Sequence, residues 1–594
     1  MLLTLSIVFL LFPKATFASE DFSIEADVTF EVTEDHNAHI THDIRLENLT
    51  TEKFTPNFTF SLNGMNAARI KVYDDAGQIP YEKRVESGKE VIVLTFNDSL
   101  VGQNKHRNFV IEFDETSLIK KTGEVWEISL PKLSENTIFD IYDVRFIVPK
   151  SLGELAYISP QADSVYQTDT ENLYYFQKDD ILPAGVTVAF GHYQTFSLDL
   201  TYHLENPLIV PSSIDVALPP DSPYQQVYFN SITPEPETLV RTEEGNWIAT
   251  YRLAGRERID ARLIGYVKVY SGPRYKEAIS NDMLQQNLAS SNVWQVDDPI
   301  IKSLALELQT PEAIYNYVID TLQYNFDSAA TTPKRLGAIE ALNNPNAAIC
   351  TEFTDLFIAL ARAAGIPARE VNGYAATENP KLQPLSLVAD VLHSWPEYYD
   401  QENHVWIPID PTWGDTTGGI DYFNKFDLKH IAFVYHGISP DEPSPPGSYK
   451  LGSNPQKDVY VNLTKTSEET AQNISAEMKY IQGSLFSKPT IDIVIHNPGP
   501  AALYNKSITL MFDNTQYKTF TIQSLLPFSE EHITVELPYG IFGSELPKNA
   551  TVHISGLEKT VTLDKTPRLV RDLLLILISI LAVSGVTFWY FKKR

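Results

Sequence analysis

The sequence has little cysteine and a shortage of positive charge. Cys350 is the single cysteine among 594 residues, so no internal disulfide can form and each domain must be stable through its core alone. The 47 Lys and Arg residues are outnumbered by 76 Asp and Glu, giving a net charge of -29. This excess of negative charge argues against nucleic acid and anionic lipid headgroups as partners, and its simplest consequence is solubility.

Two apolar segments predict export and membrane anchoring. Residues 1–18 combine an apolar run with small residues before Ser19, the pattern of a signal peptide. Residues 573–591 carry no charge and, at about 1.5 Å per residue, reach the roughly 30 Å of a bilayer core. The basic residues 592–594 follow and favour the cytoplasmic side. We therefore expect a single-pass protein of the cell membrane, with the bulk of the chain extracellular and the C-terminus cytoplasmic.

The chain between these segments is long enough for three or four domains. Apolar and polar residues alternate in short runs before Gly272 and again after about residue 457, which predicts β-sandwich structure. Helical periodicity dominates from Thr310 to Gly365. We expect a signal peptide at 1–18, an N-terminal β-sandwich at 19–192, a second β-rich domain at 193–272, a mixed α and β domain at 273–437, a linker at 438–456, an immunoglobulin-like β-sandwich at 457–566, and a transmembrane helix with a short basic tail at 567–594.

Cys350 stands where a helix is predicted to begin. The apolar residues that follow recur at steps of three and four, and a stop signal then comes at Gly365 and Pro367. Free amide groups and the positive end of the helix dipole stabilise a thiolate at such a position. Glu352 and Asp355 oppose this effect, so Cys350 needs a base to become a nucleophile. Without one, a lone cysteine is more often a small buried apolar residue.

A predicted hairpin supplies the base. The β-prone runs 391–399 and 404–410 are separated by the turn-rich residues 400–403. With a four-residue loop that places Tyr399 opposite His404, His393 lies opposite Asp410 with Cβ atoms about 5 Å apart. Cys350, His393 and Asp410 would then be the nucleophile, the general base and the group that orients the base. Pro396 must lie at an edge or a bulge because it cannot donate to the ladder.

These residues carry a family resemblance. NAAICTEFTDLFIALARAAGIPAREVNGYA and LHSWPEYYDQENHVWIPIDPTWGDT resemble the transglutaminase-like superfamily of papain-like fold, whose pattern runs Cys, helix, Arg-x-x-Gly-Ile-Pro-Ala-Arg, Gly-Tyr, His-x-Trp and Asp-Pro-Thr. The match covers roughly residues 310–437. The resemblance implies a multidomain fold in which β-sandwich domains flank an α+β papain-like transglutaminase core. It also implies that Cys350, His393 and Asp410 form the catalytic triad.

Other residues near these motifs have competing interpretations. His404 and His430 are alternative bases: His404 is expected at the surface, and His430 behind the triad. Trp395 and Thr351 are candidates for the substrate cleft, although the animal crosslinking enzymes carry Trp where this chain has Thr351. Arg362 and Arg369 are expected to be structural ion-pair donors. The spacing of Asp421, Asp427 and His430 matches no known metal site, so we predict no metal and no cofactor.

We therefore expect a membrane-anchored extracellular cysteine enzyme that acts on protein or peptide amides through a thioester. An amine acceptor gives crosslinking and water gives hydrolysis, and the sequence leaves this choice open. The alternative is a non-catalytic cell-surface adhesion or scaffold protein whose transglutaminase-like domain only binds. Its support is the large share of the chain that is accessory β-structure.

Overall fold

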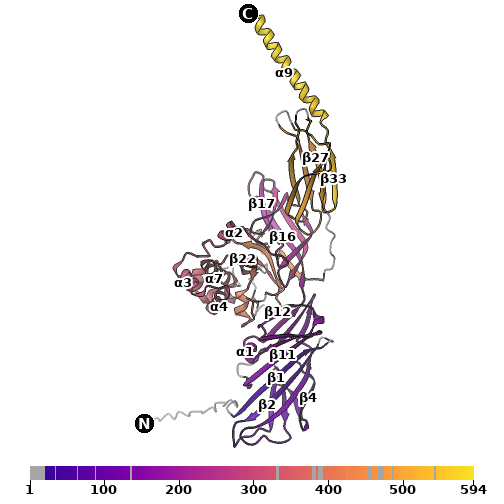
Figure 1. Cartoon of the computed structure of the whole chain (residues 1–594). Coiled ribbons are helices and arrows are strands. Elements are labelled where there is room, and N and C mark those ends of the chain that lie inside the picture. Colours follow the sequence, from indigo (N-terminus) through magenta and orange to yellow (C-terminus); the bar gives the residue numbers. More distant parts are fainter. Residues whose placement is uncertain are drawn as a thin grey trace, which may run out of the picture. The chain divides into compact units, whose positions relative to one another are not determined.

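The computed structural model describes residues 21–33, 35, 37–62, 64–86, 88–133, 137–329, 334–377, 383–384, 392–424, 426–451, 457–465, 474–483, 487–540 and 543–593 (Figure 1). The predicted signal peptide, residues 1–18, lies outside the described residues. The described part divides into two compact units. The first contains the described residues up to Gln194, residues 383–384 and the segment Ile409–Leu428, and the second contains the other described residues.

The first unit is built on an eight-stranded sheet. Its order is β13 (Ser164–Gln167), β14 (Glu171–Phe176), β11 (Ile141–Pro149), β1 (Phe22–Val32), β2 (Ala38–Asn48), β8 (Lys105–Glu115), β4 (Ala68–Asp74) and β5 (Gly77–Gln78). Strand β1 runs parallel to β11 and antiparallel to β2. Every second residue of β2 from Ala38 onward is buried, so the alternation seen in the sequence places one face of the sheet in the core.

Two smaller sheets share a core with this large sheet. One has the order β3 (Asn57–Leu62), β7 (Lys89–Thr95), β6 (Tyr81–Glu86), and the other β12 (Leu155–Ser159), β15 (Val186–Phe190), β10 (Val125–Leu130), β9 (Ile119–Thr122). Phe60 and Val188 of the small sheets belong to one hydrophobic cluster with Ile44 and Phe113 of the large sheet. The short helices η2 (Lys150–Leu152) and α1 (Lys178–Ile181) connect strands of this unit.

The second unit begins with two further sheets. A four-stranded sheet has the order β18 (Gln225–Thr233), β21 (Arg258–Tyr270), β16 (Tyr193–Glu205), β26 (Val459–Leu463), and a three-stranded sheet the order β17 (Ser212–Leu218), β20 (Trp247–Leu253), β19 (Thr238–Arg241). Strand β26 pairs with β16, with Leu198 opposite Val461. This sheet therefore combines strands from both sides of the helical region, and the predicted domain limits stay a prediction.

The mixed α and β region centres on one long helix and one sheet. Its helices are α2 (Asn281–Gln286), α3 (Pro299–Leu308), α4 (Pro311–Thr321), α5 (Phe326–Ala329), α6 (Ala338–Asn343), η3 (Pro345–Ala347) and α7 (Cys350–Ala363). The sheet has the order β24 (Val405–Pro408), β23 (His393–Asp400), β22 (Ala368–Ala375), β25 (His430–His436). Helix α7 packs against β22 and β23 on one side and against α3, α4 and α6 on the other. It is consequently buried on nearly every face rather than on one stripe.

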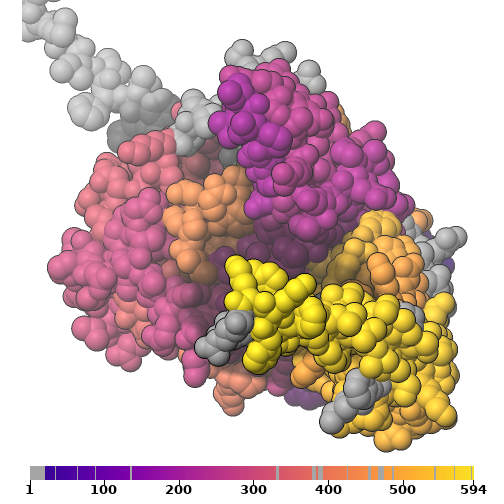
Figure 2. Space-filling model, turned by 90° about the horizontal axis from the view of Figure 1, so that it is seen from above, coloured from indigo at the N-terminus to yellow at the C-terminus, as the bar shows by residue number. Residues whose placement is uncertain are grey.

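The C-terminal part combines a β-module with an apolar helix. Two sheets have the orders β27 (Ser475–Ile481), β28 (Thr490–His496), β31 (Glu530–Glu536) and β30 (Thr515–Leu525), β29 (Leu503–Phe512), β32 (Asn549–Ile554), β33 (Leu557–Thr562), and they share one core. Helix α9 (Thr566–Lys592) follows. Its segment Leu569–Trp589 has a mean hydropathy of 2.3 and no buried residue, so it is long and apolar enough to cross a membrane (Figure 2, yellow).

Candidate active site

Cys350 is the first residue of helix α7, as the sequence predicted. Its thiol is buried, with 2% of the residue exposed. The Glu352 carboxylate accepts hydrogen bonds from the backbone N–H groups of Ile349 and Leu336, each at 3.0 Å. Glu352 therefore satisfies an amide at the helix entrance, as the acid of a capping box does, and it fixes the chain on both sides of Cys350. The predicted end of the helix is also confirmed, because Gly365 has a φ of +82° just beyond the last helical residue.

His393 is the first residue of strand β23, and the predicted hairpin forms with a different register. Tyr399 lies opposite Trp406 rather than His404, because the four-residue loop is 401–404 instead of 400–403. His404 closes this loop with a φ of +55° and cannot begin the strand. The expected pairing of His393 with Asp410 is therefore wrong by two positions, and β24 ends at Pro408.

Asp410 caps the next helix instead of ending a strand. Its carboxylate accepts a hydrogen bond from the Trp413 backbone N–H at 3.1 Å, which makes Asp410 the N-cap of α8 (Pro411–Thr416). Its own N–H donates to the carbonyl of Tyr422 at 3.2 Å. The same segment Ile409–Leu428 packs within the first unit, where the N–H of Asp421 donates to the hydroxyl of Ser159 at 2.6 Å.

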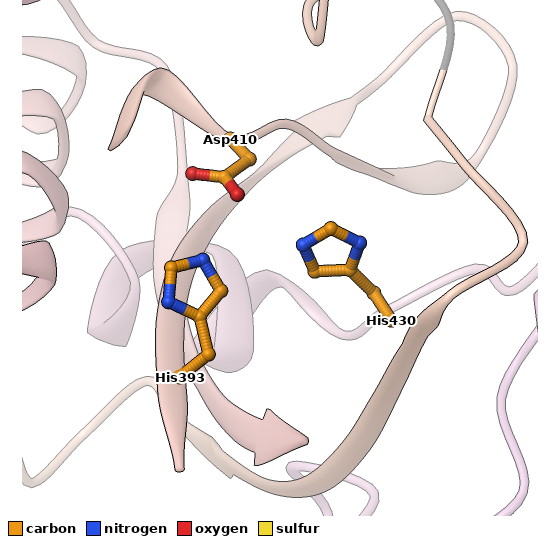
Figure 3. Close-up of side chains that lie close together, drawn as sticks. All are labelled: His393, Asp410 and His430. Carbon is orange, nitrogen blue, oxygen red and sulfur yellow. The ribbon is translucent and has the colours of Figure 1, made fainter. Parts of the chain in front are cut away.

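His393, Asp410 and His430 lie together despite the altered register. Each offers one nitrogen or oxygen atom, and these atoms are within 4.8 Å of one another. Figure 3 shows the Asp410 carboxylate pointing toward the two imidazole rings, whose centroids are 5.6 Å apart. All three residues are at least 96% buried, since their exposed fractions are 1%, 0% and 4%. We call His393, Asp410 and His430 the three-residue group, and Cys350 is not part of it.

A hydrogen bond connects the helix of Cys350 with the strand of His393. The hydroxyl of Ser394 donates to the carboxylate of Glu370 at 2.7 Å and is hydrogen-bonded to the hydroxyl of Thr354 at 3.3 Å. Thr354 stands one helical turn after Cys350, and Ser394 directly follows His393. The start of α7 and the start of β23 are thus held beside each other.

Buried charges hold the starts of α7 and β23 in place, and the sequence patterns did not predict them. Arg335 contacts both Asp355 of α7 and Glu370 of β22, and His436 lies 3.4 Å from Glu370. Burial would raise the pKa of Glu370, but Arg335 and His436 outweigh it and hold this pKa below its ordinary value. Burial also opposes protonation of His436, yet the contact with Glu370 raises the His436 pKa above 6.5. The sequence signal for this network was Asp355, a charged residue inside the apolar run of α7.

Trp395 and Thr351 differ in their relation to the three-residue group. The indole of Trp395 packs edge-on against His430 at 5.0 Å between centroids, and it lies 5.9 Å from the ring of His393. Trp395 therefore forms the wall beside both imidazoles, and only 2% of it is exposed. Thr351 is half-buried, and its hydroxyl donates to Glu352 at 3.1 Å. Their role in a substrate cleft stays a prediction.

The two arginines of the family motif have different partners. Arg369 pairs with Glu397 at 2.7 Å, as expected. Arg362 donates to the backbone carbonyls of Ala368, Ala289 and Gly437, so it joins three chain segments, and it forms no ion pair with a carboxylate among the described residues.

The acidic residues weighed as metal ligands do not join the three-residue group. Asp421 is occupied in a turn, where its carboxylate accepts from the N–H groups of Phe423 and Asn424. Among the described residues, the group that could hold a metal ion consists of His393, Asp410 and His430, without Asp421 or Asp427. His430 therefore lies beside His393 and Asp410 rather than beside the two acidic residues that are near it in sequence.

Residues 295–411, which include α7 and the two strands of the hairpin, match the model of the transglutaminase-like superfamily. The chain carries a transglutaminase-like domain. A protein-glutamine gamma-glutamyltransferase from Pseudomonas aeruginosa is 27% identical over 174 residues, which are 28% of this chain and 25% of that protein. The chain thus spans about a quarter of the length of this curated relative.

Solved structures also resemble parts of the chain, at low similarity. A proposed cysteine protease from Cytophaga hutchinsonii is 18% identical, with a TM-score of 0.32, over 47% of this chain and 92% of that one. The periplasmic domain of TgpA from Pseudomonas aeruginosa is 16% identical, with a TM-score of 0.22, over 38% of this chain and 91% of that one. These scores are too low to inform on the chemistry of the transglutaminase-like domain.

Proposed function

We propose that the transglutaminase-like domain is a cysteine acyltransferase or hydrolase acting on protein or peptide amides. Cys350 is the nucleophile, His393 the general base, and Asp410 the group that orients His393. The observation that carries this proposal is the meeting of His393 and Asp410 within 4.8 Å. The strand of His393 is tied to the helix of Cys350 through Ser394 and Thr354, which supports Cys350 as the nucleophile that this base serves.

The proposed reaction passes through a thioester. His393 takes the proton of the Cys350 thiol, and the thiolate attacks the carbonyl carbon of a carboxamide or peptide. The C–N bond breaks, the leaving amine takes the proton from His393, and the acyl group stays on sulfur. An amine or water then gives a proton to His393 and attacks the thioester, the C–S bond breaks, and the departing thiolate takes the proton from His393, which restores the thiol. Asp410 stabilises the imidazolium in both steps.

Three observations favour His393 over the other histidines as the base. His404 lies in the hairpin loop with a left-handed backbone and is exposed. His430 is in the group, but it stands on β25, which pairs with β22 and not with β23. His393 is adjacent to Ser394, the residue that contacts α7. His430 is thus assigned a supporting role beside Asp410.

The test uses the full-length chain in lipid nanodiscs. Incorporation of a labelled primary amine into a glutamine-bearing protein, release of ammonia and release of new peptide ends are measured in parallel. We expect Cys350→Ala to abolish all turnover, and His393→Gln to lower it about 10²- to 10⁴-fold, the range for loss of a general base. His404→Gln is the matched control and should keep wild-type rates.

The outcomes separate the possible reactions. Amine incorporation identifies transfer, whereas ammonia or peptide release alone identifies hydrolysis. Full activity in Cys350→Ala would sink the proposal. Two His and one carboxylate are also a donor set for divalent metals. Turnover that persists in Cys350→Ala, is lost with a chelator and is restored by the metal would therefore replace the cysteine mechanism with a metal-dependent one. Substrate binding without turnover would favour the adhesion or scaffold alternative.

We further propose that the transglutaminase-like domain occupies residues 273–437 on the extracellular side, with α9 as the anchor and Lys592 and Lys593 in the cytoplasm. The support is the length and apolarity of α9 and the basic residues at its end. Protease added to intact cells should remove the domain and leave a membrane-bound fragment containing α9. Protection of the domain in intact cells, with cleavage only after lysis, would reverse this orientation.

A further inference from the structure

The first unit contains a cavity of about 600 Å³ that the proposed reaction does not use. Its lining comes from the inner faces of β1, β2 and β11 of the large sheet, from β3, and from the ends of β10 and β15. Strand β3 is the edge of its sheet, and Leu130 of β10 lies opposite Val186 of β15. The cavity is therefore the gap left where two small sheets, instead of one continuous sheet, cover the large one. Its volume lies within the range of about 300–1,000 Å³ that is typical of small-molecule sites.

The lining is mainly apolar, with one polar pair at the bottom. Phe30, Phe60 and Leu130 are examples of the apolar part. His42 is 1% exposed, and its Nε2 lies 3.1 Å from the hydroxyl of Tyr142. Among the described residues, Nδ1 of His42 has no hydrogen-bond partner. An unpaired buried nitrogen costs free energy. A ligand that forms a hydrogen bond with this nitrogen removes that cost, which favours its binding.

The environment of His42 selects a neutral polar group. Burial lowers the pKa of His42 to about 3, so the imidazole is uncharged at neutral pH. The rings of Phe60 and Phe113 lie at 4.7 and 5.8 Å from that of His42 and surround it with apolar surface. A hydroxyl group suits this position because it donates or accepts according to the tautomer of His42. A charged group would be buried there without a counter-charge.

Positive charge is confined to the exposed part of the lining. Lys89 and Lys132 line the cavity and are both exposed, whereas none of the described lining residues is Asp or Glu. The charge of the lining is therefore positive, whereas the net charge of the chain is -29. It matches a ligand with an acidic head at the surface and an apolar body inside.

We propose that this cavity binds one long-chain acyl carboxylate, with the chain along the apolar lining and the acid against Lys89 and Lys132. A hydroxyl on the chain then reaches His42. The cavity is a second site, independent of the function proposed for Cys350. A membrane phospholipid shares the apolar acyl chain but has no free carboxylate, because its acyl groups are esterified, so recovery of a phospholipid in place of a free acid would contradict the proposed ligand.

The experiment measures binding of radiolabelled octadecanoic acid and 12-hydroxyoctadecanoic acid to the full-length chain in nanodiscs, with empty nanodiscs subtracted. We expect saturable binding of one molecule per chain, tighter for the hydroxylated acid. Reversing both charges by Lys89→Glu with Lys132→Glu should weaken binding about tenfold, as loss of two exposed ion pairs allows. Lys105→Glu, an exposed lysine on β8 outside the lining, is the matched control and should change nothing.

Three further variants test the interior. Leu133→Trp should fill the half-buried edge of the cavity and abolish binding, with thermal unfolding measured to show that the fold is kept. Tyr142→Phe and His42→Phe should remove the preference for the hydroxylated acid but leave binding of the plain acid. Extraction of the purified chain followed by mass spectrometry distinguishes a free acid from a phospholipid. Binding that never exceeds empty nanodiscs, or that neither charge reversal nor Leu133→Trp changes, would overturn the proposal.

Discussion

At the scale of single residues, the second imidazole beside Asp410 separates two kinds of histidine. His393 adjoins the contact with α7, whereas His430 touches Trp395 and shares Asp410. We expect His430→Gln to lower kcat by less than about tenfold, well short of the effect of removing a general base. The pH dependence of kcat should shift, because Asp410 then has one imidazole partner in place of two. An effect as large as that of His393→Gln, without a pH shift, would contradict this assignment.

Gly373 is required by the space around it. A Cβ at this position would meet the carbonyl oxygen of Ile431 and lie 2.7 Å from Cη2 of Trp395. Because both atoms belong to the wall of the three-residue group, we expect Gly373→Ala to lower the free energy of unfolding by about 1–3 kcal/mol, the usual cost of overpacking. Gly272→Ala is the control, since nothing lies within 4 Å of a Cβ there. Equal thermal unfolding of the two variants would refute the steric argument.

At the scale of elements, the entrance of α7 depends on a side chain of its own first turn. Glu352→Ala leaves the N–H groups of Ile349 and Leu336 without their acceptor, so we expect a loss of about 1–3 kcal/mol in the free energy of unfolding. Turnover should fall by more than the loss of folded protein explains, because Cys350 begins the same helical turn. The exposed Glu340 in α6 is a matched control, and Glu340→Ala should have little effect on either quantity.

The contact of β25 with β22 makes stability depend on pH. The pKa of His436 in the folded protein lies above its ordinary value of 6.5, so protonation of His436 favours folding. This stabilisation is complete below about pH 6.5 and is lost as the pH rises through the folded-state pKa. We expect His436→Gln to destabilise the protein most at low pH, with a difference from wild type that shrinks as the pH rises. Denaturant unfolding from pH 5.5 to 8.5 measures this difference, and a difference that grows with pH would contradict the sign.

The elements show how far the sequence predicted the site and where it failed. Helix α7 was predictable because its periodicity and its stop at Gly365 are local signals. The hairpin register was not, because His404 takes a left-handed backbone that the turn composition does not specify, and this moved Tyr399 opposite Trp406. Asp410 still meets His393 because it caps α8, a contact outside any strand ladder. The network around Arg335 joins segments distant in sequence, which leaves no periodic trace.

At the scale of the whole molecule, α9 differs from every other long helix described in having no buried residue in its apolar span. Such a surface is stable in a bilayer and unstable in water. We expect the full-length chain to require detergent or lipid, and a chain ending at Asp564 to remain in the supernatant after ultracentrifugation with unchanged turnover. Retention of the shortened chain on membranes would reveal a second means of attachment.

The pairing of β26 with β16 has a mechanical consequence. Phe196 near the start of β16 lies opposite Leu463 at the end of β26, so the two strands leave their ladder at the same end. When the membrane anchor and the N-terminal strands are pulled apart, tension passes from one strand to the other across this ladder, which opens one pair of residues at a time. Residues 273–437 lie between β16 and β26 in the chain, so the covalent route through them is pulled taut only after this ladder has opened.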